Sequence, residues 1–289
     1  MRRSFTGPAE FLADPPNRAR VGEYLADMAR PYAREVPVAL FGEPPSPALG
    51  HSYGEMAEAL IGPAVPAAEP VDLLVLAFSI HDLRPGRQTA AYLSHLTPGA
   101  PMAFAICDQG SAAAFTGLRI AREYAASAGI RRALLVVVEQ AALPYDCPAP
   151  VPAQHRGVAM LYGDGLYGDG AMPRARVADV RQHPGVPPGD VARLAAADLA
   201  ELAASHHDVA LVLSDALAAV WAAPAAGRVR VMPPGQPSTE VWWGLIDELT
   251  GDADPVAPAG HPDLLVAADY DPHLRYLCLT AFDTGSRWS

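Results

Sequence analysis

Short, uninterrupted apolar runs alternate along this chain with longer segments of helical character. The clearest runs are Asp72–Phe78, Met102–Cys107 and Arg132–Glu139. Such runs are typical of strands covered on both faces, as in a parallel sheet packed between helices. Between the second and third runs, residues 111–127 carry apolar side chains at helical spacing. A strand, a helix and a strand in this order form a right-handed crossover, so the sequence predicts an α/β fold.

The same alternation continues beyond a proline-rich stretch at residues 143–155, which is the best candidate boundary. We expect further strands at 158–162, 174–181, 208–213, 229–232, 262–268 and 274–281. We expect helices at 190–204, with Asp190 as N-cap, and at 215–223 and 239–249. The predicted organisation is an N-terminal arm at 1–35, helical or irregular, an N-terminal half at 36–145 and a C-terminal half at 146–289. Two such halves suggest an internally duplicated, layered architecture, although no sequence repeat is visible.

The chain contains no lysine: all 21 basic residues are arginines, and the formal net charge is −11. The absence of lysine excludes a pyridoxal phosphate Schiff base, a lysine nucleophile and a P-loop lysine on nucleotide phosphates. The negative charge disfavours nucleic-acid binding, which depends on a basic surface. The longest apolar run is too short to span a bilayer, and the N-terminus lacks the apolar segment of a signal peptide. We therefore expect a cytoplasmic protein.

The cysteines and histidines do not indicate a metal centre. Cys107, Cys147 and Cys278 form no Cys-x-x-Cys pair and no Cys/His cluster with zinc spacing. None of the nine histidines shows His-x-x-x-His spacing. We expect neither a metal nor a bound cofactor.

Two serines stand in motifs that suggest chemistry. Ser52 lies in Gly50-His-Ser-Tyr-Gly54, which matches the nucleophile elbow of serine hydrolases. The elbow requires a strand before the serine, whereas the preceding residues predict a loop. A helix-capping role for Ser52 is therefore favoured, and a hydrolase that uses Ser52 is the weaker alternative. Ser111 ends Cys107-Asp-Gln-Gly-Ser111, at the start of the predicted helix. That position suits a nucleophile or an oxyanion, although spacing alone favours capping by Ser111 and packing of Cys107.

Several segments together resemble the thiolase-fold condensing enzymes, and most closely the ketoacyl-ACP synthase III branch. Residues 103–121 resemble that family's strand, nucleophile turn and buried helix, and residues 129–139 its following strand. The Tyr-Gly-Asp-Gly sequence at 162–165, repeated at 167–170, is similar to a glycine-rich turn that opens the family's second half. The resemblance covers about residues 50–282. It implies a five-layer αβαβα fold, acyl-CoA or acyl-carrier-protein substrates and a homodimer.

The departures from the family concern its Cys-His-Asn catalytic triad. The resemblance places Ser111 at the cysteine position, or Gly110 when the alignment is counted from the strand. It places Ser214 at the histidine position, or Leu213 under a shifted alignment, and Gln236 at the asparagine position. Residues 267–272 replace a glycine-rich loop, and the family's first strand is expected to be missing.

These replacements change the expected chemistry. A serine hydroxyl is a weak nucleophile without an adjacent base, and no histidine remains to stabilise an enolate. The resemblance therefore implies a divergent acyltransferase of specialised, polyketide- or fatty-acid-like biosynthesis and not a decarboxylative condensing enzyme. Its expected site is Ser111 as acyl acceptor, Gln236 as oxyanion donor and Ser214 as auxiliary group. The alternative is a catalytically silent partner or scaffold of an active ketosynthase. The acidic chain is poorly suited to binding an acidic carrier protein, so any docking patch for one would have to be built from local arginines, such as Arg84, Arg87, Arg131 and Arg132.

Overall fold

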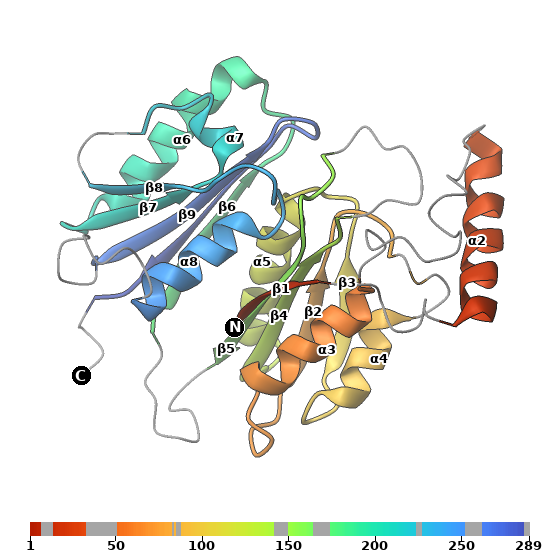
Figure 1. Ribbon diagram of the computed structural model, residues 1–289. Coiled ribbons are helices and arrows are strands. Elements are labelled where there is room, and N and C mark those ends of the chain that lie inside the picture. The colour runs from red at the N-terminus through yellow and green to blue at the C-terminus, as the bar shows by residue number, and fades with distance from the viewer. Residues whose placement is uncertain are drawn as a thin grey trace.

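The computed structural model describes residues 1–6, 14–32, 51–82, 84, 88–141, 150–163, 174–223, 227–251 and 262–285. Within these ranges the chain forms two five-stranded sheets (Figure 1). The first sheet has the order β1 (Arg2–Phe5), β5 (His155–Gly163), β4 (Arg132–Glu139), β2 (Leu73–Ala77) and β3 (Met102–Ile106). The second has the order β6 (Arg176–His183), β10 (Tyr276–Asp283), β9 (Leu264–Asp271), β7 (Val209–Leu213) and β8 (Arg228–Val231).

The two sheets share one topology. When the strands of each sheet are numbered in chain order, both follow the order 1-5-4-2-3. In each, the last three strands of this order are parallel, and the first two are antiparallel to their neighbours. The predicted duplication is therefore present in the topology, although it is invisible in the sequence.

The helices form three layers around the two sheets (Figure 1). They are α3 (Tyr53–Ala64), α4 (Thr89–Leu96), α5 (Ala112–Ser127), α6 (Pro188–Ala203), α7 (Asp215–Ala218) and α8 (Glu240–Thr250). The remaining helix, α2 (Pro15–Ala29), with the short η1 (Arg30–Tyr32), stands apart from these layers. The pair α3 and α4 covers the outer face of the first sheet, and α6 and α7 cover that of the second. Helices α5 and α8 lie between the sheets, so the predicted five-layer αβαβα architecture is confirmed.

Alternation along the central strands decides which side chain enters which layer. On β2, Leu73, Val75 and Ala77 join the core between the sheets, whereas Leu74 and Leu76 pack under the outer helices. Burial on both faces explains why this strand is an uninterrupted apolar run. The register of β9 follows the same rule and determines which of its residues reach the middle layer.

Two strands correct the expected organisation. The N-terminal arm contains a helix as expected, but it also contains β1, so the family's first strand is not missing. Only Phe5 of this four-residue strand is buried, and two arginines begin the strand. So short and polar a segment gives no strand signal in the sequence. Strand β5 follows the proline-rich stretch yet pairs with β4 of the first sheet. The division between the sheets therefore falls between Gly163 and Arg176, and the expected division at 145/146 does not match it.

Three local expectations also differ. Helix α6 begins at Pro188 with Pro187 as N-cap, so Asp190 lies inside the first turn and is not the cap. Helix α7 ends at Ala218 rather than at residue 223. Strand β3 is an edge strand with exposed positions, whereas its composition predicted full burial.

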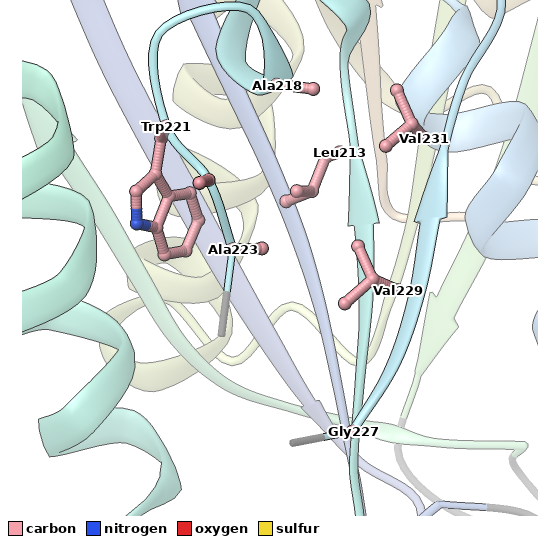
Figure 2. Close-up of a pocket in the computed structure, with 8 residues that line it drawn as sticks. Leu213, Ala218, Trp221, Ala223, Gly227, Val229 and Val231 are labelled. Carbon is pink, nitrogen blue, oxygen red and sulfur yellow. The ribbon is translucent and has the colours of Figure 1, made fainter. Parts of the chain in front are cut away.

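The short α7 leaves part of the second sheet uncovered. In the first sheet the equivalent helix, α4, packs on both β2 and β3, whereas α7 packs on β9. A hollow of about 480 Å³ remains on this outer face, lined by Leu213, Trp221, Val229 and Val231 among others (Figure 2). The hollow lies on the face of the sheet opposite to the layer that holds α5 and α8.

Candidate active site between the two sheets

Ser111 lies directly before α5, at the inner end of the turn that follows β3. Asp108 and Gly110 in this turn have positive φ angles of 60° and 54°. A side chain at Gly110 would overlap the carboxylate of Asp271, so glycine is required there. Ser111 is 7% exposed, and its hydroxyl makes no capping hydrogen bond to α5. The capping role expected from spacing is therefore wrong.

The hydroxyls of Ser111 and Ser214 both act on the pKa of Asp269, which they lower against the rise that burial causes. Asp269 belongs to β9, where Leu265 and Ala267 face the middle layer and Ala268 and Tyr270 face outward. Continued alternation directs Asp269 into the middle layer, toward the start of α5. The carboxylate is 4% exposed. One buried carboxylate thus joins the two serines that the resemblance placed at the cysteine and histidine positions.

Ser214 is held at the end of β7 by two backbone hydrogen bonds. Its N–H donates to the Ala268 carbonyl oxygen at 3.1 Å, next to Asp269 in sequence. Its hydroxyl oxygen accepts from the Leu217 N–H at 3.1 Å and caps the single turn of α7. Ser214 is fully buried, so the position of its hydroxyl is fixed by the sheet and the cap together.

Glu139 on β4 is the counterpart of Asp269 in the first sheet. On β4, Glu139 is the first residue that faces the middle layer beyond the last parallel pair with β2. On β9, Asp269 is the first such residue beyond the last parallel pair with β7. Glu139 accepts from the Ser238 N–H at 2.9 Å and from the Thr239 hydroxyl, directly before α8. Each sheet therefore places one buried carboxylate at the N-terminal end of the central helix that belongs to the other half.

Gln236 lies in the loop that Glu139 anchors and is 4% exposed. Its amide nitrogen donates to the carbonyl oxygens of Gln154 at 3.3 Å and Gly235 at 2.6 Å. The amide oxygen of Gln236 is buried without a hydrogen-bond partner in the described part of the chain. The hydrogen bonds of its amide therefore tie Gln236 to its own loop and to the start of β5, and not to the two serines.

Acidic groups surround the two serines. Burial raises the pKa of Asp269 to about 6, although the two hydroxyl donors oppose the shift. Glu240, the first residue of α8, is 2% exposed, and burial together with the nearby Asp269 and Asp215 raises its pKa to about 10. At neutral pH the Glu240 carboxyl group therefore favours its protonated form. A site of this charge disfavours anionic groups on a substrate.

Asp271, two residues beyond Asp269, holds the backbone of the site. One of its carboxylate oxygens accepts from the Ser111 N–H at 3.3 Å. The other accepts from the N–H groups of His273 and Leu274, each at 2.9 Å, and closes the turn between β9 and β10. The amide of Ser111 at the helix start, a natural oxyanion donor, is thus already engaged.

The remaining sequence-predicted residues lie elsewhere. Ser52 is the N-cap of α3, with a complete capping box to Glu55, and is fully buried; the predicted capping role is confirmed. Cys107 is exposed rather than packed, and burial together with Asp108 raises the pKa of its thiol, which makes it a poor nucleophile. The repeated Tyr-Gly-Asp-Gly lies mostly outside the described residues, apart from the end of β5.

Three of the four arginines named for a docking patch lie within the described residues, at two places on the first sheet. Arg131 and Arg132 are at the start of β4, and Arg132 is paired with Glu69. Arg84 follows the opposite end of the parallel strand β2, and Arg87 lies outside the described residues. Arg131 and Arg132 therefore lie at one end of the parallel strands and Arg84 beyond the other end.

Three further observations bear on the class of protein. No helix in the described ranges is long and apolar enough to cross a membrane. Within the same ranges, no group of three or more His, Cys, Asp or Glu residues is arranged to hold a metal ion. No protein-family model matches the chain, and no curated protein matches its sequence.

Solved structures do match the fold. The 3-oxoacyl-(acyl carrier protein) synthase III of Pseudomonas aeruginosa PAO1 superposes with a TM-score of 0.58 at 16% identity, covering 80% of this chain and 83% of that one. The tetronic acid condensing enzyme AbyA1 gives 0.57 at 17% identity, with coverages of 81% and 86%. ChlB3, described as an acyltransferase, gives 0.55 at 17% identity, with coverages of 82% and 85%. The chain therefore has the thiolase fold of the condensing enzymes, in a form similar to ketoacyl-ACP synthase III.

Proposed function

We propose that this protein is a divergent, ketosynthase III-like acyltransferase that accepts acyl groups from CoA or acyl-carrier-protein thioesters. The observation that carries the proposal is the position of Ser111, which is buried directly before the central helix α5 and makes no capping hydrogen bond to it. A serine so placed is a suitable acyl acceptor because the helix start favours developing negative charge. In this scheme Ser214 is auxiliary. Gln236 must release the carbonyl oxygen of Gln154 before its amide can donate to an oxyanion.

Decarboxylative condensation is not part of the proposal. That reaction develops an enolate, which needs hydrogen-bond donors, whereas the Ser111 N–H is already bonded to the Asp271 carboxylate. Simple transfer of an acyl group to a hydroxyl, an amine or water requires no enolate. The proteins of similar fold include a tetronic acid condensing enzyme and one described as an acyltransferase, which supports a place in specialised biosynthesis.

The test is formation of an acyl-enzyme. The protein is incubated with a panel of acyl-CoAs and acyl-carrier proteins, and intact-mass spectrometry with peptide mapping locates any adduct. We expect an acyl ester on Ser111 that is absent from Ser111→Ala. Absence of any adduct and of any turnover with the whole panel contradicts the proposal.

A catalytically silent partner of an active ketosynthase is the second candidate. Two observations favour it: Ser111, Ser214 and Gln236 are each at least 93% buried, and the Ser111 N–H is bonded to Asp271. Copurification with a ketosynthase, combined with no acyl adduct, supports this second function over the first.

We also propose a homodimer formed at the open edge of the first sheet. Strand β3 ends that sheet, and Met102 on it is 45% exposed. Pairing of this edge with a second copy removes an exposed strand edge from solvent. Light scattering after gel filtration tests the proposal, and a monomer at micromolar concentration contradicts it.

A further inference from the structure

We propose that helix α2 of one copy of this chain docks on the outer face of β8 in a second copy. The docking surface, which we call the β8 face, is formed by Val229, Val231 and Trp221. The proposal is independent of acyl transfer, because this face lies on the side of the second sheet away from the middle layer and Ser111. It depends on a strand that lacks a covering helix, a helix that lacks a sheet, and a sequence pattern that matches the two.

The first half of the chain shows what is missing from the β8 face. Because the two sheets share one topology, α7 is the counterpart of α4, and β8 is the counterpart of β3. Helix α4 has eight residues and packs on both β2 and β3, whereas α7 has four residues and packs on β9. In the described part of the chain, β8 is therefore without the helix that its counterpart has.

Exposed valines mark the β8 face. Val229 and Val231 are 40% and 50% exposed, and with Trp221 they border the hollow of about 480 Å³ (Figure 2). The arginines of β8 alternate with these valines and face the middle layer, where Arg230 pairs with Asp247 of α8. Apolar side chains gathered in this way beside an open strand edge indicate an interaction surface.

Helix α2 is a helix without a sheet. Among the described elements its packing partner is the short η1 that continues it, and Figure 1 shows it apart from both sheets. Residues 21, 24, 25 and 28 are Val, Tyr, Leu and Met, a spacing that gives a helix one apolar face. Val21 is buried, but Tyr24, one turn further on, is 44% exposed. The helix therefore has an apolar side chain available for a further contact.

The sequence of α2 matches that of α4. Tyr24-Leu-Ala-Asp-Met28 and Tyr92-Leu-Ser-His-Leu96 share a tyrosine, a leucine and a further long apolar residue at the same spacing. In α4, Leu93 is fully buried in the core that β2 and α3 form, and the Tyr92 hydroxyl donates to Glu58 of α3 at 2.7 Å. A helix with this pattern is suited to cover the equivalent strand of the second sheet.

The partner is a second copy because α2 and the β8 face lie on opposite sides of one molecule. In Figure 1, α2 stands beyond the first sheet, away from β8. The segments that join α2 to the rest of the chain, residues 6–14 and 33–50, both lead to the first half. Even the shorter segment extends to about 30 Å, so α2 can reach a neighbouring molecule. Reciprocal exchange of α2 between two copies gives a closed twofold dimer.

The experiment is disulfide cross-linking between two full-length variants in which Cys107 and Cys147 are replaced by serine, which leaves the buried Cys278. One variant carries Tyr24→Cys and an affinity tag, and the other carries Val231→Cys without a tag. The two are mixed at micromolar concentration and oxidised, and the disulfides are mapped by mass spectrometry. We expect a disulfide between positions 24 and 231 of different chains.

Leu96→Cys is the matched control for Val231→Cys. Leu96 is 42% exposed at the end of α4, on the outer side of the first sheet, where α4 already covers the strands. We expect this variant to form no disulfide with the Tyr24→Cys chain. Equal yields with the two partners overturn the inference. A disulfide between two Val231→Cys chains in place of the expected one also overturns it, because the β8 strands would then pair with each other. So does a disulfide that forms only within single chains carrying both cysteines, because α2 would then cover its own molecule.

Val231→Asp tests the same contact without cysteines. The side chain is half exposed, so the fold tolerates an aspartate there, but docking of α2 would bury the new charge. We expect the dissociation constant for self-association, measured by analytical ultracentrifugation, to rise at least about tenfold. Where pairing through β3 also forms, the native protein assembles beyond the dimer and the variant stops at the dimer. Unchanged assembly in Val231→Asp, or a native protein that neither associates nor cross-links, contradicts the exchange of α2.

Discussion

The charge of the side chains beside Ser111 sets which acyl groups the site accepts. Asp269 and Asp271 both contact this residue. A like charge placed next to a partly desolvated carboxylate costs several kcal/mol. We therefore predict that acetyl- and longer neutral acyl-CoAs acylate Ser111 at least about tenfold faster than malonyl- or succinyl-CoA, which carry a free carboxylate. The measurement is the initial rate of adduct formation by mass spectrometry. Equal rates for acetyl- and malonyl-CoA contradict this picture of the site.

Ser52 has a structural role as a helix cap, in contrast to the acyl-accepting role proposed for Ser111. It donates to the Glu55 side chain at 2.7 Å and accepts from the Glu55 N–H at 3.2 Å. Loss of such a cap costs about 0.5–2 kcal/mol. We predict that Ser52→Ala lowers the free energy of unfolding in urea by this amount and leaves the formation of any acyl adduct on Ser111 unchanged. An ester-hydrolysis activity that is lost in Ser52→Ala would instead support the hydrolase reading of the motif.

At the scale of the elements, two glycines allow the central helices to approach the sheets. A Cβ atom on Gly244 of α8 would lie 2.7 Å from Val212 on β7, and one on Gly117 of α5 would lie 2.9 Å from Leu135 on β4. We predict that Gly244→Ala lowers the free energy of unfolding by about 1–3 kcal/mol, because the overpacking outweighs the gain in helix propensity. Gly189→Ala on the exposed start of α6, where a Cβ meets nothing within 4 Å, is the control and is not destabilised. Equal effects of the two substitutions in urea unfolding contradict the argument.

The elements differ in how well their sequences predict them, for physical reasons. The strands β2 and β4 are covered on both faces, so their sequences are continuous apolar runs and were predicted to within about a residue or two. β1 is short and two of its four residues are exposed arginine or serine, so its sheet position comes from pairing with β5 and not from its own composition. α7 was predicted too long because Ala218–Ala223 has helical composition, and composition does not define where the turn ends.

At the scale of the whole molecule, the site exists only because two similar halves face each other. The first half contributes Ser111, and the second contributes Ser214 and Asp269. The resemblance pointed to both serines but not to the carboxylate that joins them. A signal for Asp269 was present, since it is an acidic residue that continues the inward alternation of a strand predicted to end at residue 268. To assign Asp269 to the site, one must know where β9 ends and how the second sheet packs against α5. Neither follows from local sequence.

Buried carboxyl groups also give the whole molecule an unusual dependence of stability on pH. Burial raises the pKa of Asp269 to about 6, of Glu139 to about 7 and, with its acidic neighbours, of Glu240 to about 10. An acid whose pKa is higher in the folded state binds more protons there, so its contribution is complete below the unfolded pKa and is lost as pH rises through the folded pKa. The windows are therefore about 4 to 6 for Asp269, 4.5 to 7 for Glu139 and 4.5 to 10 for Glu240.

We accordingly predict that the free energy of unfolding, measured in urea, falls from pH 5 to pH 8 instead of passing through a plateau. Each group that holds one extra proton in the folded state contributes a slope of about 1.4 kcal/mol per pH unit, so the fall is steepest below pH 6 and, above pH 7, reflects Glu240 alone among these three. Glu240→Gln reproduces the neutral form of this side chain and removes its slope of about 1.4 kcal/mol per pH unit across the whole range from pH 5 to pH 8, so the curve flattens above pH 7 and falls less steeply below it. A native curve that is flat or rising between pH 7 and pH 8, or a Glu240→Gln curve parallel to it, would mean that Glu240 is ionised in the folded protein. The acidic centre would then repel acyl donors through one more full charge, and the preference for neutral acyl groups would be correspondingly stronger.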